Sequence, residues 1–182
     1  MTKPLAERIS DYQELLLEVG IAGASVTETA PRTLLSTVSL TDNSPELAFG
    51  VLVTEEEIKS VAGDLFSSGH YNIAVSQAYK ALDKFVEAKS KIKGKSGRDL
   101  MNAAFSPNKP KLTWTDMKTK SEINEQEGYH LMFSGVMAAV RNPVTHEFGW
   151  VDEPREALDL ILIAQHLLRK AKQAQPPTQP LP

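Results

Sequence analysis

The period of the apolar side chains constrains the fold of this chain more than any other feature. In most segments between residues 54 and 174, apolar residues return every three or four positions. Because an α-helix turns once in about 3.6 residues, this spacing aligns them along one stripe of a helix. Glycine- and proline-containing junctions separate the segments. The pattern predicts an all-α fold, an up-and-down bundle of four to five helices over residues 54–174.

Several helix ends can be predicted from local residues. Thr54 and Glu57 form the pattern of a capping box, and Gly69 suits the reversal that ends the same helix. Ser96 is expected to cap a short helix. Pro143 is expected to end or kink a long one. The expected helices span residues 54–68, 70–92, 96–105, 121–142 and 153–172.

The two ends of the chain are expected to differ from the bundle. Residues 1–53 are predicted to be an N-terminal extension, in which the segment ISDYQELLLEV is an amphipathic helix and the rest has no clear period. Residues 175–182, QPPTQPLP, have too few apolar side chains to form a core, and we expect them to be disordered or extended.

Composition excludes several classes of protein. The 182 residues include no cysteine, so there is neither a disulfide nor a thiolate metal site, which is typical of a reducing compartment. The first residues, MTKPLAERIS, have no apolar stretch of the kind found in signal peptides, so we expect no signal segment, and the longest near-apolar run is about half of a membrane span. His70, His130 and His166 lie on separate predicted helices without ligand spacing. We expect a cytoplasmic protein with no membrane partner, no metal and no other cofactor.

Positive charge is concentrated in one window of an otherwise acidic chain. The net charge is −3, but the window from Lys84 to Lys111 has eight cationic and two anionic side chains, a net charge of +6. A solvated helix end running into a flexible loop is one interpretation of this window. A surface that touches phosphates is the other. Lys80, Lys95 and Arg98 are the candidates for contact with such a substrate.

The segment VRNPVTHE, residues 140–147, combines three polar side chains with a proline. Asn142 and His146 share a face of a helix, whereas Arg141 and His146 lie about 140° apart on an uninterrupted one. If Asn142 caps a new turn that starts at Pro143, the chain bends there. Arg141 could then turn toward the side of His146.

Arginine and histidine together suit phosphate chemistry. Arginine offers a fixed fork of donors to phosphate oxygens, and histidine titrates near neutral pH. RNA supplies its own nucleophile, the 2′-hydroxyl, so its cleavage needs only a base, an acid and positive charge. The other interpretation is a polar helix end, in which these side chains cap the helix and interact with its dipole.

The sequence also resembles a known family. RNPVTH is similar to the R-x4-6-H signature of HEPN domains, in which the residue after the arginine is often asparagine. Four blocks, in order, resemble the Ymh-type branch of that superfamily, which includes abortive-infection-like proteins. They are LFSSGHYNIAVSQAYKALDKFV, KSGRDLMNAAFS, EQEGYHLMFSGVMAAVRNPVTHE and EALDLILIAQHLLRK.

This resemblance implies an all-α homodimer in which two motifs, one per copy, form a composite site that cleaves RNA without a metal. Arg141 would stabilise the phosphate, His146 would be the acid and base, and Asn142 would orient the phosphate or the histidine. Some HEPN ribonucleases have a tyrosine two positions after the histidine, where this chain has Phe148.

Four small residues precede the motif, and they favour close approach of another helix, either from a second copy or from the same bundle. They are Ser134, Gly135, Ala138 and Ala139.

Two functions therefore follow as hypotheses. The first is an endoribonuclease of a defence or toxin-like system, with an antitoxin or regulatory partner. The second is a non-catalytic module that dimerises or binds a nucleotide or a partner.

Overall fold

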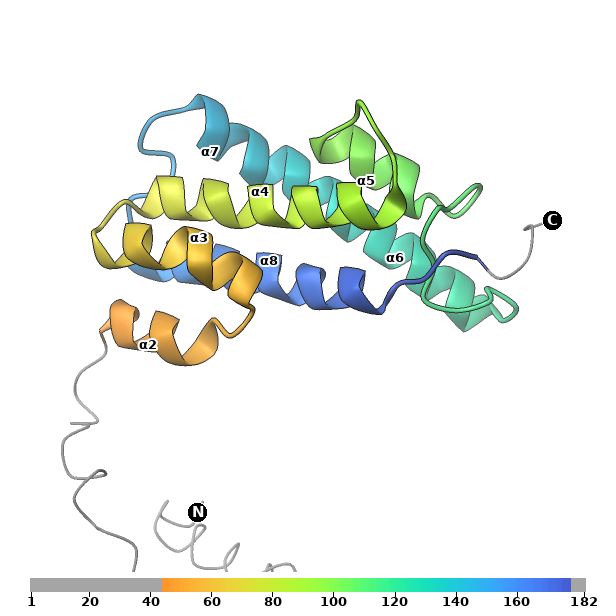
Figure 1. Cartoon of the computed structure of the whole chain (residues 1–182), viewed down its shortest axis with the longest axis horizontal. Helices are drawn as coiled ribbons and strands as arrows, with labels where there is room; N and C mark the ends of the chain where they lie inside the picture. Colours follow the sequence, from red (N-terminus) through yellow and green to blue (C-terminus); the bar gives the residue numbers. More distant parts are fainter. Residues whose placement is uncertain (1–43, 178–182) are drawn as a thin grey trace, which may run out of the picture. The chain divides into compact units, whose positions relative to one another are not determined.

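The computed structural model describes residues 44–177, and these residues form a bundle of helices (Figure 1). Within this range there is one isolated antiparallel bridge and no strand, which confirms the all-α prediction. The helix expected in ISDYQELLLEV and the tail residues 178–182 lie outside the described residues. The elements are α2 (Pro45–Leu52), α3 (Glu56–Ser67), α4 (Tyr71–Ser90), α5 (Gly97–Phe105), α6 (Lys120–Val136), a π-helical turn η1 (Met137–Arg141), α7 (Asn142–His146) and α8 (Pro154–Gln173).

The helix α4 lies at the centre of the bundle. It contacts α3, α8, α5 and α7, and α5 also packs on α6 (Figure 1). Gly69, at φ 77°, makes the reversal between α3 and α4, as its position in the sequence predicts. None of the helices between residues 44 and 177 is both long and apolar enough to cross a bilayer.

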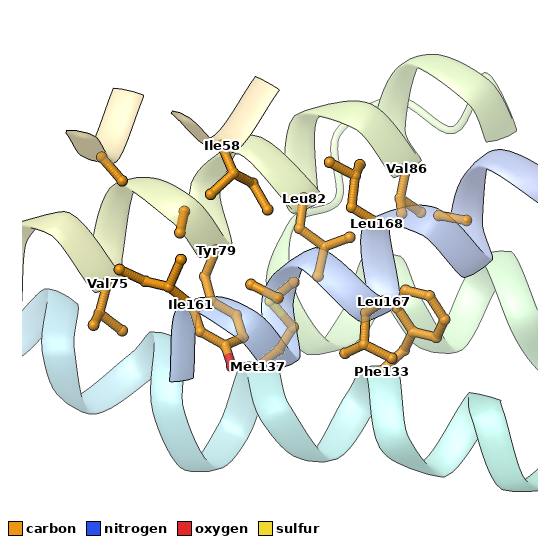
Figure 2. Packing of buried hydrophobic residues seen from close by; sticks show 14 of the residues in the cluster. Ile58, Val75, Tyr79, Leu82, Val86, Phe133, Met137, Ile161, Leu167 and Leu168 are labelled. Atoms are coloured by element: carbon orange, nitrogen blue, oxygen red, sulfur yellow. The ribbon is translucent and has the colours of Figure 1, made fainter. Parts of the chain in front are cut away.

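The core of the bundle comes from the apolar stripes of α3, α4, α5 and α8, together with Phe133 of α6 and Met137 of η1. Figure 2 shows Ile58, Tyr79, Leu82, Met137 and Leu167 directed toward one another, and all five are fully buried. The Tyr79 hydroxyl donates a hydrogen bond to the carbonyl of Leu160 at 3.1 Å, so its polar group is satisfied inside the core. Burial raises the pKa of the Tyr79 phenol above its ordinary value.

The predicted capping box at Thr54 and Glu57 is wrong. Helix α3 starts at Glu56, and no side chain caps it locally. Instead, the buried Gln165 of α8 accepts hydrogen bonds from the amides of Thr54 at 2.7 Å and Glu55 at 3.0 Å. Glu57 pairs with Lys172 of α8. Packing against α8 thus gives the Thr54 amide a partner in Gln165, while the Glu57 carboxylate, which a capping box would direct to that amide, pairs with Lys172.

The bundle begins before residue 54. Residues within the predicted extension form α2, whose first turn contains Pro45, a position that suits proline. Phe49 of α2 is 4% exposed and stacks on Phe66 of α3 with 4.7 Å between ring centroids. Val53, the residue directly after α2, is fully buried and also belongs to the core. The segment has no clear apolar period because Phe49 is the single buried residue among the eight of α2.

The C-terminal end of the bundle is held by the loop between α5 and α6. Thr113 and Gln175 exchange two backbone hydrogen bonds of 2.8 Å, the isolated bridge of this structure. The indole of Trp114 donates to the carbonyl of Lys170 at 2.7 Å. The loop therefore closes over the end of α8. Gln175, the first residue of the predicted tail, belongs to the bundle.

Candidate functional site

The long helix α6 does not stop at Pro143 but widens before it. A π-helical turn precedes the proline, and the amide of Asn142 bonds to the carbonyl of Met137, five residues earlier. Proline has no amide, and its ring clashes with the carbonyl four residues before it in an α-helix. The extra residue in the π turn relieves this conflict. The expectation that Asn142 is a cap is wrong, because it has helical dihedral angles and makes no cap bond.

Helix α7, which contains His146, is fixed to the bundle at several points. Val144 is 4% exposed and belongs to the core. The Thr145 hydroxyl donates to the carbonyl of Arg141 at 2.6 Å and lies 3.5 Å from the hydroxyl of Ser76 on α4. The motif therefore has a defined backbone, and His146 is exposed at its end.

Asn72, in the first turn of α4, holds the end of the motif. Its side-chain amide donates to the carbonyls of Val144 at 3.1 Å and Glu147 at 3.3 Å. Its side-chain oxygen accepts from the amide of Val151 at 3.3 Å. One side chain thus connects α4, the last turn of α7 and the loop that follows. Each of these backbone groups would otherwise need another partner.

The Arg141 guanidinium lies between Asn142 and the start of α5. Its Nη1 donates to the side-chain oxygen of Asn142 at 3.4 Å, and a Cβ built on Gly97 would lie 3.9 Å from the same nitrogen. Within residues 44–177, no hydrogen bond joins the Arg141 side chain to His146. The structure therefore brings Arg141 and Asn142 together, with His146 one helical turn beyond Asn142 on the exposed surface.

A buried carboxylate lies behind Arg141. Asp83 of α4 is 4% exposed and accepts a hydrogen bond of 2.6 Å from the amide of Gly97. Burial raises the pKa of Asp83 above its ordinary value, while the Gly97 hydrogen bond and the positive charge of Arg141 act in the opposite direction. Gly97 itself has φ 55°, a conformation that favours glycine. Asp83 therefore fixes the start of α5 beside the arginine.

The basic candidates lie on elements that border this site. Lys95 and Arg98 flank Gly97 within the segment that meets Arg141, and both are exposed. Lys80 is exposed on α4, one turn after Ser76 and one turn before Asp83. Other cations of the basic window have structural partners, such as Lys84, which pairs with Glu87 at 2.7 Å. Part of the positive charge thus lies next to the motif.

The small residues before the motif divide into two sets. Ser134 is buried inside the bundle. Gly135 and Ala139 are exposed, and apart from the adjacent residues and the backbone of the same helix, no atom of the described residues lies within 4 Å of a Cβ built on Gly135. Leu131, 62% exposed, and Met132, 46% exposed, lie beside them on α6. An exposed apolar face therefore leads along α6 toward Asn142 and His146.

Sequence reasoning missed Asn72 and Asp83. Both lie on α4, whose apolar period indicates only its core face. The sequence does show that the two belong to one face of the helix, because residues 72 and 83 are eleven positions apart and so lie within about 20° of each other around it. With Ser76, they form a polar stripe on a core helix, and buried polar side chains at such a stripe need partners.

Two of the other histidines, His130 and His166, have partners elsewhere in the bundle. His130 lies 2.9 Å from the Asn102 side-chain oxygen, and burial lowers the pKa of its imidazole. His166 lies 3.2 Å from the Tyr129 hydroxyl. Between residues 44 and 177, no three histidines or acidic residues lie together in a way that could hold a metal ion. The chemistry available at the motif is that of a guanidinium, an amide and an exposed imidazole.

Comparison with known proteins identifies one family. Residues 53–171 match the family model described as "Protein of unknown function (Hypoth_ymh)", which is more than half of the chain. The matched range includes the motif, Asn72, Asp83 and the basic candidates. No curated protein and no solved structure matches the chain.

Proposed function

This chain belongs to the Hypoth_ymh family, whose function is unknown, and we propose that it is a HEPN-type endoribonuclease that cleaves RNA without a metal. Arg141, Asn142 and His146 form its site. The observation that carries the proposal is the fixed presentation of these three side chains, of which Asn142 and His146 are exposed and Arg141 is half-buried. The π turn, which contains Arg141, continues directly into α7, which contains Asn142 and His146, and the Asn72 hydrogen bonds fix the far end of α7.

The reaction follows from the chemistry of these groups. His146 takes the proton of an RNA 2′-hydroxyl, whose oxygen then attacks the adjacent phosphorus. The bond from phosphorus to the 5′-oxygen breaks, and this oxygen receives a proton from an imidazolium. The products are a 2′,3′-cyclic phosphate and a 5′-hydroxyl. Arg141 stabilises the extra negative charge of the pentavalent phosphorane, and Asn142 orients the arginine by accepting its hydrogen bond.

One histidine cannot be base and acid on opposite sides of the same phosphorus at once. A second copy of the chain supplies the other imidazole in the proposed homodimer. The exposed face of α6 supports this, because Gly135 and Ala139 leave room for a second helix and Leu131 and Met132 offer apolar surface to bury. The face leads directly to the motif, so two copies would bring two motifs together.

Positive charge beside the motif supports RNA as the substrate. Lys80, Lys95 and Arg98 are proposed to contact phosphates on either side of the scissile one. The rest of the chain has a net negative charge, so this attraction is local. Binding should therefore weaken as salt rises, with a slope that falls when these residues are replaced.

The proposal is tested by incubating the full-length protein with single-stranded RNA in the presence of EDTA. We expect cleavage products ending in a cyclic phosphate. His146→Ala and Arg141→Ala should each reduce the rate by at least about 100-fold, because each removes a group used in the transition state. His166→Ala is the matched control, since this exposed histidine lies on α8 and contacts Tyr129; it should cleave as the wild type does.

Two outcomes would contradict the proposal. If His146→Ala cleaves as fast as the wild type, the activity belongs to another site or to a contaminant. If no RNA is cleaved while Arg141→Ala and His146→Ala change the oligomer mass, the motif serves the non-catalytic module instead.

A further inference from the structure

The loop between α7 and α8 displays two aromatic rings to solvent. Phe148, two residues after His146, is fully exposed, and Trp150 is 56% exposed. Large apolar side chains are usually hidden from water, and two of them at one turn indicate a surface that binds something. Both rings follow His146, the candidate acid and base, within four residues, so a ligand bound to them would lie close to the candidate site.

The turn that holds these rings is built and fixed. Gly149, between them, has φ 63°, and a Cβ there would lie 3.2 Å from a carboxylate oxygen of Asp152. Both facts favour glycine at this position. Val151 is 1% exposed, and its amide donates to Asn72 at 3.3 Å. The rings therefore project from a turn that is tied to α4, so displaying them requires little ordering when a ligand binds.

A pocket of about 300 Å³ opens beside Phe148. The residues of its wall include Phe148, Gly149 and Asp152 from the loop, Asn72 and Ile73 from α4, and His70 just before α4. The site thus combines flat apolar surface with hydrogen-bonding groups at the edge. A pocket of this volume is at the lower end of the range that small molecules occupy.

We propose that this pocket binds an unpaired nucleobase of single-stranded RNA, stacked on Phe148, next to the phosphate that the motif cleaves. This inference rests on the proposed function and adds the part of the substrate that is recognised. An unstacked base has a π face for the phenyl ring and polar edges for the rim of the pocket. Two residues of chain span at most about 7 Å, so Phe148 and His146 lie within reach of adjacent nucleotides.

The charges of the pocket favour a base over a phosphate. Asp152 is the acidic residue among those that line the pocket, and its negative charge disfavours a phosphate group inside it. A carboxylate can instead accept a hydrogen bond from an exocyclic amino group, as in the pairing of aspartate with cytosine N4. Asp152 is therefore assigned the selection of an amino-bearing base. Uracil, which has a carbonyl at that position, should bind less well.

Binding of RNA that cannot be cleaved tests the inference separately from catalysis. The probes are fluorescein-labelled 12-mers of cytidylate and uridylate, methylated at every 2′-oxygen so that the nucleophile is blocked. Fluorescence anisotropy with the full-length protein gives Kd. We expect tighter binding of the cytidylate probe, a Kd about tenfold higher for Phe148→Ala with either probe, and a normal Kd for Phe148→Tyr, which keeps the ring. Asp152→Asn should reduce the difference in Kd between the cytidylate and uridylate probes.

The control and the contrary outcomes separate this inference from the proposed function. Ile163→Ala removes an apolar side chain that is 40% exposed on α8, and it should bind as the wild type does. If Phe148→Ala binds both probes normally while unmodified RNA is still cut in a His146-dependent way, the base pocket is wrong and the nuclease stands. If RNA is never cut but binding depends on Phe148, the pocket stands and the nuclease is wrong. A Phe148→Ala protein with normal Kd and halved oligomer mass would assign the turn to an interface between copies.

Discussion

At the scale of the residue, Asn72 is the side chain on which the motif depends most. It makes hydrogen bonds to three backbone groups of two segments. Asn72→Ala should lower the free energy of unfolding by about 2 kcal/mol, because it leaves partly buried carbonyls without a donor. Urea denaturation measures this. Ser76→Ala, which removes only one 3.5 Å contact to Thr145, should cost less than about 0.5 kcal/mol. Equal losses for both variants would contradict the assignment.

Asp83 makes the stability of the protein depend on pH. Burial raises the pKa of its carboxyl in the folded protein above the ordinary value of 3.8. Folding therefore favours the protonated form, and this contribution to stability is complete below the pKa of the unfolded chain and is lost as pH rises through the folded pKa.

The test compares the wild type with Asp83→Asn, which keeps an oxygen to accept the Gly97 amide and cannot ionise. The free energy of unfolding of the wild type, relative to that of the variant, should fall as pH rises from about 3.8 through the raised pKa. Denaturation at a series of pH values measures the difference. A difference that stays constant or rises over this window would show that Asp83 is not destabilised by burial.

At the scale of the element, α6 starts with a complete capping box. The Thr119 hydroxyl accepts from the Glu122 amide at 3.2 Å, and a Glu122 carboxylate oxygen accepts from the Thr119 amide at 2.9 Å. Thr119→Ala should lower the free energy of unfolding by about 1 kcal/mol. Ser96 holds the same position before α5 but makes no cap bond. Ser96→Ala should therefore change stability by a few tenths of a kcal/mol at most, and thermal denaturation distinguishes the two.

The π turn is a second element whose role can be tested. It places Arg141 and Asn142 one residue out of α-helical register, and Pro143 maintains it. Pro143→Ala restores an amide and removes the ring, so a regular α-helix becomes available. We expect the free energy of unfolding to rise by about 1–2 kcal/mol and RNA cleavage to fall by about tenfold or more, because the side chains rotate around the helix.

A Pro143→Ala protein that is no more stable and cleaves normally would mean that the π turn has another cause. Proline at this place would then be incidental to the site. Circular dichroism and the RNA assay are enough to decide, because the two expected changes have opposite signs for stability and activity.

Some features that depend on neighbouring residues could be predicted from the sequence, whereas those that depend on distant residues could not. Gly69 reverses the chain as expected, because its conformation is a local property. Thr54 and Glu57 have the right spacing for a cap, but Gln165, more than one hundred residues away, accepts the Thr54 amide that Glu57 would accept in a capping box. The π turn was missed because periodicity cannot tell an α turn from a turn with one more residue.

At the scale of the whole molecule, the candidate site is assembled by α4. The motif at residues 141–146 could be found in the sequence, since its residues are consecutive. Asn72 and Asp83 could not be connected with it, because only the packing of α4 against α5 and α7 brings them there. The same packing brings the basic segment around Gly97 next to Arg141. The concentration of positive charge in the sequence could not predict that these two segments meet.

The proposed homodimer is the property of the whole molecule that is easiest to disrupt. Gly135→Lys adds a long charged side chain to the exposed face of α6, where no other helix or loop of the described residues has an atom within 4 Å of the new Cβ. Replacing a helical glycine should not destabilise the monomer, and the added positive charge should not repel RNA. The variant should nevertheless have half the mass of the wild type by light scattering and should lose RNA cleavage, because each copy lacks the second imidazole.

Gly50→Lys, the same change at an exposed glycine of α2, is the matched control and should keep both the dimer mass and RNA cleavage. A Gly135→Lys protein that remains dimeric and active would place the interface elsewhere, and one that becomes monomeric yet cleaves RNA normally would show that a single motif is sufficient.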